Sequence, residues 1–408
     1  MKMQIEQAIK DLLNGKMVVI ADDIHRENES DLVIAAEKIS PKDVAFMVQH
    51  TSGILCVPML TKDLTRLCLP QMVCHNTEAH HTAFTTSVDY KHHITTGISA
   101  HDRALTIKNL ANPSAEAHDF ARPGHIFPLQ YQEGGVLQRA GHTEASIDLL
   151  KMGGSYPAAT IAELVDHNSC PLDRTAAQQF AEKHQLTYVT VSEIITYRKH
   201  HENLVEKVSE ATLSTTWGEF LVIVYRCCIT LQEHVVFIKG DPHKKTPLVR
   251  IHSECLTGDI FHSISCDCGN QLNLAMELIA QEDGIFIYLK GQEGRGIGLG
   301  NKIHTYFLQK SGYDTVDANL ALGFSPDNRT YDSAAHILRE LQISTISLLT
   351  NNPEKSHTLE TYGITIENRI PLLSPLTKEN RFYLQTKQTK LGHLFPDGYF
   401  QGTSYEEH

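Results

Sequence analysis

The second half of the chain contains, in order, R-I-H-S-E-C-L-T-G-D (residues 250–259), S-C-D-C-G-N-Q-L (265–272) and G-Q-E-G-R-G-I-G-L-G-N-K (291–302). These polar runs alternate with apolar segments of strand and helix length. The alternation predicts an α+β domain with a mixed sheet. The runs themselves lie between the predicted elements, where binding and catalytic residues are commonly found.

Three cysteines in these runs predict a metal site. Cys255, Cys266 and Cys268 supply three soft ligands, and a catalytic zinc keeps its fourth position open for water. The spacing C-x10-C-x-C differs from that of a zinc finger, and His252 and His262 are the only nearby candidates for a fourth ligand. The alternative is three thiols that are buried by chance. Cys266 and Cys268 precede a predicted helix, whose N-terminus stabilises thiolates, and this favours the metal site.

The glycine-rich run predicts a close approach of backbone to an anion. Four glycines alternate from 294 to 300, and Arg295 and Lys302 add positive charge to the same turn. The run matches neither a P-loop nor a dinucleotide fingerprint, and a simple strand-to-helix turn is the alternative.

Length and composition set the wider limits. A chain of 408 residues, 41% hydrophobic and 21% charged, predicts two globular domains. The polar stretch 196–214 separates two apolar-patterned regions, so we place the boundary near residue 205, with domains 1–204 and 205–408. Both domains are expected to be α+β (mixed α/β), each a mixed sheet with packed helices.

Charge and cysteine content exclude several classes of protein. A net charge of −12 disfavours a nucleic-acid partner. The N-terminal segment predicts a short amphipathic helix with no basic leader and no membrane span, so we expect a cytoplasmic protein. Nine scattered cysteines fit a reducing compartment better than a disulfide framework.

Hydrophobic periodicity predicts the main elements. The first half should contain strands at 17–20 and 31–36 and a helix that begins at Ser40-Pro41. In the second half the same patterns predict strands at 219–225, 234–238, 247–251, 285–289 and 344–350, and helices at 270–281, 299–311 and 331–341.

Residues 205–395 resemble GTP cyclohydrolase II. The resemblance rests on the first two runs quoted above and on Q-E-G-R-G-I-G-L, Y-D-T-V-D-A-N, L-G-F-S-P-D-N-R and L-L-T-N-N-P-E-K. It implies hydrolysis of GTP to 2,5-diamino-6-(5-phosphoribosylamino)pyrimidin-4(3H)-one, formate and pyrophosphate. It also implies zinc on the three cysteines, a proton acceptor at Asp327, a nucleophile at Arg329 and Tyr306 in the site. The implied GTP contacts are Arg250, Ile251, His252, Ser253, Glu254, Gln271, Glu293, Gly294, Arg295, Thr315, Thr350 and Lys355.

The role of Arg329 stays open. A guanidinium is protonated at any physiological pH, so a nucleophilic arginine would have to lose its proton to a neighbour such as Asp327. A phosphate clamp, with magnesium on the phosphate oxygens, is the alternative. Zinc would make hydroxide available near neutral pH for opening the imidazole ring. Thr330 replaces the acidic residue usual in the family.

The first half contains a crowded acidic loop, D-D-I-H-R-E-N-E-S-D (22–31). Five carboxylates in one connection predict either a solvated loop or a cation site. The loop is accompanied by T-T-G-I-S-A-H-D-R (95–103), R-P-G-H-I-F-P-L (122–129) and G-G-V-L-Q-R-A-G-H-T-E-A (134–145). Together, residues 1–200 resemble 3,4-dihydroxy-2-butanone 4-phosphate synthase, which converts ribulose 5-phosphate to the butanone phosphate and formate.

The resemblance implies magnesium (or manganese) on Glu27 and His142, and proton transfer by His125 and Glu163. Cys56, Asp22 and Thr96 match supporting positions. The implied substrate contacts are Arg26, Glu27, Asp31, Arg139, Ala140, Gly141, His142, Thr143 and Glu163. The sequence departs from the family at Ile24, His25, Ser30, His81, Ala162 and residues 168–174. A side chain at residue 30 or 81 would crowd a site that expects bare backbone.

The two resemblances together predict a bifunctional riboflavin-biosynthesis enzyme that uses zinc and magnesium and acts on GTP and ribulose 5-phosphate. By resemblance we also expect a homodimer. One alternative is a chain in which only the cyclohydrolase half works and the first half is a scaffold. Another is a zinc-dependent guanine-nucleotide sensor without turnover, which would need neither Asp327 nor Arg329.

Overall fold

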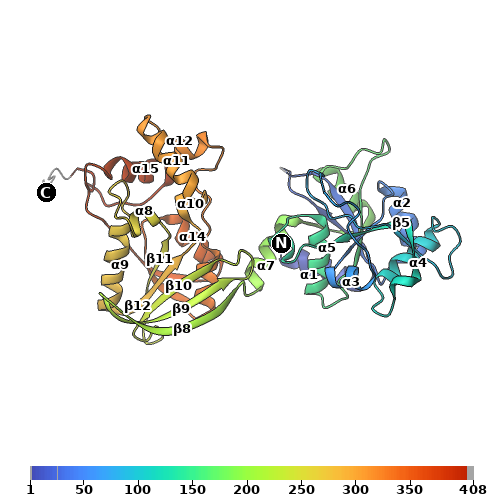
Figure 1. Cartoon of the computed structure of the whole chain (residues 1–408), viewed down its shortest axis with the longest axis horizontal. Helices are drawn as coiled ribbons and strands as arrows, with labels where there is room; N and C mark the ends of the chain where they lie inside the picture. The colour runs from blue at the N-terminus through green and yellow to red at the C-terminus, as the bar shows by residue number, and fades with distance from the viewer. Residues whose placement is uncertain (1, 25, 402–408) are drawn as a thin grey trace. The chain divides into compact units, whose positions relative to one another are not determined.

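The computed structural model describes residues 2–24 and 26–401 (Figure 1). Contacts divide the chain into two compact units, Met1–His201 and Glu202–His408. Each unit contains one seven-stranded sheet with helices packed on it, and both sheets mix parallel and antiparallel pairs. The α+β fold class with two mixed sheets is therefore confirmed.

The N-terminal unit is built on a sheet with the order β4-β5-β3-β6-β2-β1-β7. Its strands are β1 (Val18–Ala21), β2 (Ser30–Ala35), β3 (Cys56–Met59), β4 (Val88–Tyr90), β5 (Phe120–Gln130), β6 (Ala159–Glu163) and β7 (Thr187–Thr190). Its helices are α1 (Lys2–Leu13), α2 (Pro41–His50), α3 (Thr61–Arg66), α4 (Ala100–Leu110), α5 (His142–Met152), α6 (Arg174–His184) and α7 (Val191–His201).

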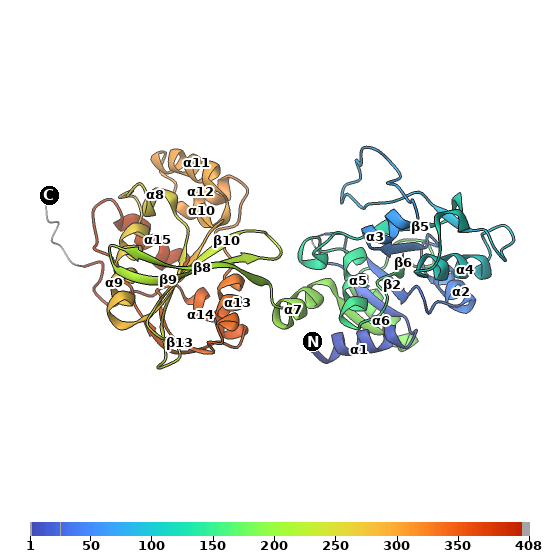
Figure 2. The same cartoon turned by 60° about the horizontal axis from the view of Figure 1, so that its bottom comes forward.

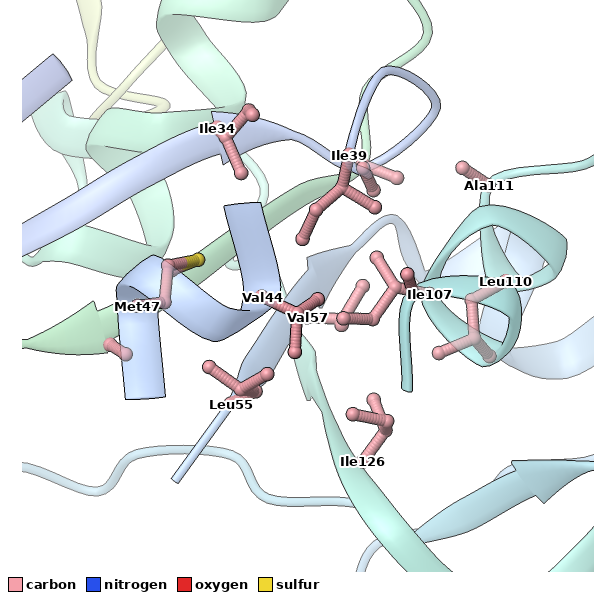
Figure 3. Packing of buried hydrophobic residues seen from close by; sticks show 14 of the residues in the cluster. Ile34, Ile39, Val44, Met47, Leu55, Val57, Ile107, Leu110, Ala111 and Ile126 are labelled. Atoms are coloured by element: carbon pink, nitrogen blue, oxygen red, sulfur yellow. The ribbon is translucent and has the colours of Figure 1, made fainter. Parts of the chain in front are cut away.

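Alternation along the central strands explains why this sheet is covered on both faces. Leu32 and Ile34 of β2 belong to one apolar cluster with residues of α2 and α4, whereas Val33 and Ala35 belong to another with residues of α1 and α5. Figure 3 shows the first cluster, in which Val44 of α2 and Ile107 of α4 lie close to Val57 of β3. Ser40 caps α2 in a capping box, as the Ser-Pro pair predicted.

The C-terminal unit has the sheet order β14-β13-β11-β12-β10-β9-β8. Its strands are β8 (Val205–Thr215), β9 (Gly218–Cys227), β10 (Glu233–Lys239), β11 (Leu248–Ser253), β12 (Gly284–Leu289), β13 (Thr345–Leu349) and β14 (Thr365–Ile370). Its helices are α8 (Leu256–Asp259), α9 (Cys268–Glu282), α10 (Glu293–Gly296), α11 (Leu299–Lys310), α12 (Thr315–Ala321), α13 (Asp332–Glu340), α14 (Pro353–Thr361) and α15 (Arg381–Leu391). Every element predicted for this half is present.

The arrangement of these elements gathers the polar runs at one end of the sheet. Helices α9 and α13 pack on opposite faces (Figure 2). Strands β11 and β12 are parallel neighbours, so α8 and α10, which follow them, emerge at the same edge. Helices α11 and α12 lie beside them in both views (Figures 1 and 2). The site is thus built where parallel strands end, as expected for open α/β sheets.

The polar stretch 196–214 comprises the end of α7 and most of β8 rather than an unstructured linker. Strand β8 pairs only with β9, and nearly all of its side chains are exposed. An exposed edge strand needs polar residues on both faces, which explains the composition. Among the residues that the structure describes, no helix is long and apolar enough to cross a bilayer.

Candidate active sites

The three cysteines converge in the C-terminal unit. Their sulfur atoms all lie within 4.8 Å of one another, and the Sγ atoms of Cys255 and Cys266 are 3.8 Å apart. Cys255 follows β11, and Cys268 is the first residue of α9. Within residues 2–24 and 26–401 this is the only such group of three potential ligands, and neither His252 nor His262 belongs to it. The donor set fits zinc with an open fourth position.

Gly258 allows the three sulfur atoms to lie close together. The spacing of the cysteines in the sequence did not predict this role for a glycine. A Cβ at this position would lie 2.9 Å from the sulfur of Cys266 and 3.1 Å from that of Cys255. The backbone of α8 thus forms one wall of the sulfur cluster. The position requires glycine because of space rather than backbone conformation.

The thiols share their protons unequally. Hydrogen bonds with Cys266 and Cys268 hold the pKa of Cys255 well below its usual range, and the Lys302 ammonium adds to the effect. The hydrogen bond with Cys255 and burial raise the pKa of Cys266 to about 11. The cluster therefore carries one thiolate at neutral pH, and a bound dication would displace the remaining protons.

Lys302 of α11 lies at the centre of the supporting network. Its Nζ donates to Cys255 Sγ at 3.1 Å, to Thr257 Oγ1 at 2.7 Å and to Glu293 Oε1 at 2.5 Å. The hydroxyls of Thr257 and Tyr306 are 3.0 Å apart. Burial alone would lower the pKa of Lys302, but the charges of Cys255 and Glu293 outweigh it and raise the pKa. The lysine remains a cation beside the sulfur atoms.

Two joined cavities of about 620 and 450 Å³ adjoin the sulfur cluster. Both are lined by Ser253, Cys268, Arg329 and Tyr383. The first also contains Glu254, Glu293, Gly294, Arg295, Tyr306 and Thr315. The second also contains Arg250, His252, Gln271, Thr350 and Lys355. The fold therefore brings together all but two of the residues that the sequence assigned to this site.

The two exceptions have other positions. The side chain of Ile251 is buried in the apolar core, and its carbonyl accepts a hydrogen bond from Lys355 Nζ at 2.7 Å. Asp327 does not line either cavity but binds Arg329, which does. Each of the two residues thus positions a cation that lines a cavity: Ile251 holds Lys355, and Asp327 holds Arg329.

The second cavity is unusually rich in buried cations. Arg250 is 4% exposed and Lys355 5%, and burial lowers the pKa of Arg250 to about 10 and that of Lys355 well below its usual value. Arg250 Nε in this cavity, and both terminal nitrogens of Arg295 in the first cavity, are buried without a hydrogen-bond partner among the described atoms. Unpaired buried donors are destabilising unless a ligand satisfies them. The arrangement fits a polyanion.

Arg329 and Asp327 form a two-bonded ion pair. Arg329 Nε donates to Asp327 Oδ1 at 2.9 Å, and NH2 donates to Oδ2 at 2.5 Å. Burial alone would lower the pKa of Arg329, but Tyr331 and the Asp327 carboxylate outweigh it and raise the pKa. The guanidinium is thus held protonated in this geometry.

The candidate site of the N-terminal unit is a cavity of about 1110 Å³. Loop 22–29, the end of β6 and the start of α5 supply most of its polar lining. It contains Arg26, Glu27, Asp31, Arg139, His142, Thr143 and Glu163 from the predicted set, together with Cys56, Glu29, Glu78, His80 and Thr82. The acidic loop therefore faces a cavity and is more than a solvated connection.

Sheet register places two of its carboxylates together, because Asp31 of β2 lies opposite Glu163 of β6. Burial raises the pKa of Asp31 well above its usual value, and Glu163 and Glu27 add to the effect. Burial also lowers the pKa of His142, whose Nδ1 lies 3.6 Å from Asp31 Oδ1 and 3.8 Å from Glu27 Oε2. The oxygen Asp31 Oδ1 and the nitrogen His142 Nε2 are buried without a hydrogen-bond partner among the described atoms.

This excess of carboxylates around a neutral imidazole fits a divalent cation. Carboxylate oxygens are the ligands that magnesium prefers, and magnesium keeps several waters, so few protein ligands suffice. A bound dication would also relieve the repulsion that raises the pKa of Asp31.

A second ion pair supports the turn before α5. Arg139 NH1 donates to Glu144 Oε2 at 2.7 Å, and Arg139 NH2 donates to Thr82 Oγ1 at 3.0 Å. A Cβ on Gly141 would lie 2.6 Å from Arg139 NH1, so a larger residue there would shift the guanidinium of this pair. Ala140 is half-buried against the apolar core and does not line the cavity.

His125 is the predicted proton-transfer residue that this cavity does not contain, and Asp22, Thr96 and Gly141 do not line it either. It lies on β5, where its Nδ1 is 2.6 Å from Asp89 Oδ2, and its side chain is 42% exposed. Gly97 packs against this dyad, since a Cβ there would lie 2.2 Å from Asp89 Oδ2. The pair is well oriented but opens elsewhere on the surface of the unit.

The departures from the family pattern do not fill the cavity. Ser30 is buried beside Asp31 but does not line the cavity, as alternation along β2 requires. His81 is exposed with a φ of 53°, whereas its neighbours His80 and Thr82 do line the cavity. His25 lies outside the described residues. The expected crowding at residues 30 and 81 is therefore absent.

Comparisons with known proteins agree with this division. Residues 6–197 match the family model of 3,4-dihydroxy-2-butanone 4-phosphate synthase, and residues 206–371 match that of GTP cyclohydrolase II.

Relatives of similar organisation cover nearly the whole chain. The probable bifunctional riboflavin biosynthesis protein RIBA 1, chloroplastic, of Oryza sativa subsp. japonica is 50% identical over 96% of this chain and 74% of its own. The riboflavin biosynthesis protein RibBA of Bacillus mycoides (strain KBAB4) is 48% identical over 96% of this chain and 98% of its own. A solved structure, RibBX of A. baumannii, a two-domain 3,4-dihydroxy-2-butanone 4-phosphate synthase, is 33% identical, with a TM-score of 0.63 over 85% of this chain and 93% of its own. The chain therefore belongs to the bifunctional riboflavin biosynthesis proteins, with a 3,4-dihydroxy-2-butanone 4-phosphate synthase followed by a GTP cyclohydrolase II.

Proposed function

We propose that the two cavities are the two active sites of this bifunctional enzyme, one acting on GTP and the other on ribulose 5-phosphate. The observation that carries the proposal is the opposite charge of their linings. Unpaired cationic donors surround the cavity beside the sulfur cluster, whereas clustered carboxylates line the other. A triphosphate needs the first environment, and a divalent cation needs the second. Neither the scaffold nor the sensor alternative has an observation in its favour.

In the cyclohydrolase unit, the residues that hold the substrate are separate from those that open the ring. Arg250 and Lys355 in the second cavity would bind the outer phosphates, and Arg295 in the first cavity adds positive charge toward the junction; their donors are free or bound only to carbonyl groups. The proposed zinc, on Cys255, Cys266 and Cys268, would supply hydroxide near neutral pH when bound. Tyr306 lines the cavity beside those sulfurs, where its hydroxyl, 3.0 Å from that of Thr257, can orient the guanine ring.

We assign Arg329 the role of a phosphate clamp rather than a nucleophile. It lines both cavities, and its two-bonded pair with Asp327 favours the protonated guanidinium. A protonated guanidinium can neutralise the α-phosphate while pyrophosphate leaves, but it cannot attack it.

In the synthase unit, Glu27 and His142 would hold magnesium or manganese, which supplies charge stabilisation for an enediolate when bound. Asp31 and Glu163 are neighbouring carboxylates, and burial, together with repulsion from Glu163 and Glu27, raises the pKa of Asp31 and so favours its protonated form. Such a pair can donate a proton at one carbon of the substrate and accept a proton from another. Arg139, held by Glu144, faces the cavity and can bind the phosphate of the substrate.

We further propose that the chain works as a homodimer in which His125 serves the cavity of a second copy. His125 and Glu163 are both assigned to proton transfer, yet only Glu163 lines the cavity of its own chain. Mixing inactive His125→Ala and Glu163→Ala chains tests this. Shared sites would restore part of the synthase activity, whereas no recovery after subunit exchange would contradict them.

The cytoplasmic location stays a prediction, since the rice relative is a chloroplast protein.

Formate release from each substrate tests the assignment of the two sites. We expect Cys266→Ser to abolish formate from GTP and to spare formate from ribulose 5-phosphate. Glu27→Ala should do the reverse. The exposed Cys228→Ser is the matched control for the thiol and should leave both reactions intact. Loss of both activities in either site variant would contradict the assignment of separate sites.

A further inference from the structure

The C-terminal helix α15 contributes a side chain to the nucleotide cavity that neither the sequence motifs nor the family match includes. The match to GTP cyclohydrolase II ends at residue 371, and α15 begins at Arg381. Its residue Tyr383 nevertheless lines both joined cavities. The inference that follows rests on the proposed binding of GTP there.

Four residues line both cavities, and three of them have their polar atoms engaged. Ser253 Oγ donates to Gln292 Oε1 at 2.7 Å, and Arg329 is paired with Asp327. Cys268 belongs to the sulfur cluster. The hydroxyl of Tyr383 has no hydrogen-bond partner among residues 2–24 and 26–401, although a tyrosine hydroxyl that faces a cavity can donate one hydrogen bond. It is the free donor at the junction.

The position of Tyr383 is fixed by its neighbours. Lys387, one turn further along α15, places its Nζ 4.4 Å from the centre of the Tyr383 ring and donates to Asp267 Oδ1 at 2.7 Å. Asp267 lies between two of the proposed zinc ligands and also accepts from Gln271. The guanidinium carbon of Arg295 lies 5.9 Å from the centre of the same ring. Two cations therefore contact the Tyr383 ring, and both interactions favour one position of the ring and its hydroxyl.

The junction corresponds to one part of the substrate. The sulfur cluster borders the first cavity, so the guanine ring must lie there, and the buried cations place the β- and γ-phosphates in the second. The ribose and the α-phosphate, which join the guanine ring to the outer phosphates, therefore pass between Arg329 and Tyr383. We propose that Tyr383 is a substrate-binding residue of the cyclohydrolase whose hydroxyl donates a hydrogen bond to the α-phosphate of GTP.

The test uses the full-length chain and the Tyr383→Phe substitution, which removes the hydroxyl but keeps the ring near Arg295 and Lys387. Binding of guanosine, GMP and a non-hydrolysable GTP analogue is measured by calorimetry. A hydrogen bond to a charged group contributes about 1.5–3 kcal/mol, or about 10- to 100-fold in affinity. We expect GMP and the GTP analogue to bind more weakly by the same factor within this range, and guanosine to bind unchanged.

Tyr399→Phe is the matched control, because Tyr399 belongs to the same C-terminal segment but lines neither cavity, and its hydroxyl donates to the carbonyl of Ser374 at 2.6 Å. It should leave all three affinities unchanged. Zinc content and synthase activity should be equal in wild type and both variants.

Three results would overturn the proposal: unchanged affinities in Tyr383→Phe, weaker binding of guanosine as well, or weaker binding of the GTP analogue alone. The first means no contact, the second a contact to ribose or base, and the third a contact to the outer phosphates. Failure of the proposed function is distinguishable from these, because wild type would then release no formate from GTP, whereas the binding series needs no turnover.

Discussion

The two candidate active sites carry opposite charge imbalances in similar folds. In the C-terminal unit, Arg250, Arg295 and Lys355 are buried with donors in excess of acceptors. In the N-terminal unit, Asp31, Glu27 and Glu163 surround a neutral imidazole. Each imbalance weakens the unliganded fold, because buried charges without partners are destabilising. The charge missing from each site thus supports the proposed ligands, an anion in one and a cation in the other.

The supporting residues differ in the same way. The cyclohydrolase site depends on a compact cluster, in which three sulfur atoms lie within 4.8 Å and a glycine forms the wall. The synthase site is wider, and its proposed metal ligands Glu27 and His142 are 3.8 Å apart. A compact site tolerates no added atom, whereas a wide one can accept changes at its rim. The predictions below test this contrast.

The largest effect is expected from Gly258→Ala. The added methyl group would occupy space 2.9 Å from the sulfur of Cys266, so the cluster must open and zinc should be lost. Elemental analysis should find zinc-free protein, and formate release from GTP should fall to background while the synthase reaction continues. Gly300→Ala is the control, since no atom lies within 4 Å of a Cβ there. Retained zinc in Gly258→Ala would show that the cluster is not compact in solution.

Arg329→Lys should distinguish a clamp from a nucleophile. A lysine keeps the charge but loses the two-bonded geometry, so we expect kcat/KM for GTP to fall about 10- to 100-fold, as for one lost charge-assisted hydrogen bond. The exposed Arg226→Lys in β9 should have no effect. Complete loss of turnover in Arg329→Lys with the affinity for a GTP analogue preserved would favour the nucleophile instead.

Lys302→Met should weaken zinc binding. Three thiolates and one zinc ion carry a net charge of −1, which the buried ammonium of Lys302 balances through its bond to Cys255 Sγ. Groups in this position change metal affinity by about 10- to 100-fold. Competition with a chelator measures the change, and Lys310→Met at the exposed end of α11 is the control. Equal zinc affinity in both variants would remove Lys302 from the site.

The sequence contained the reactive groups of both sites but not their surroundings. Cys255, Cys266 and Cys268 are close in sequence and precede a predicted helix, which favoured a metal site over thiols buried by chance. The apolar runs predicted five of the seven strands of the second half but neither β8 nor β14. Gly258 acts by having no side chain, which leaves no chemical signature. Tyr383 lies more than a hundred residues from Cys268 and reaches the cavity only because α15 packs back on the unit. His125 did not join its predicted partners because it lies four residues along β5 from Leu129, the residue of that strand that lines the cavity, and the sequence did not specify where along the strand the cavity would form.

The synthase site should show its missing cation in the pH dependence of stability. The folded pKa of Asp31 is raised, so the folded state binds a proton that the unfolded state releases, and the stability of magnesium-free protein falls as pH rises above the ordinary carboxyl range. Hydrogen exchange of β2 and β6 amides measures this. Asp31→Asn should flatten the dependence, and magnesium should reduce it in wild type. A wild-type profile as flat as that of Asp31→Asn would contradict the repulsion.

The smallest effect is expected at the rim, from His81→Gly. His81 has a left-handed φ of 53°, which costs a residue with a side chain about 1–2 kcal/mol of stability. Glycine avoids this cost, but its greater freedom in the unfolded chain takes back about 0.5–1 kcal/mol. We expect the free energy of unfolding to rise by about 0.5–1 kcal/mol with synthase activity unchanged, because the side chain is exposed and does not line the cavity. His93→Gly, also exposed at a φ of 59°, should give the same gain, which would place the effect in the backbone. A gain in synthase activity in His81→Gly but not in His93→Gly would mean that the imidazole of His81 does reach the substrate. The edge of the wide site would then tolerate side-chain changes no better than the sulfur cluster does at Gly258.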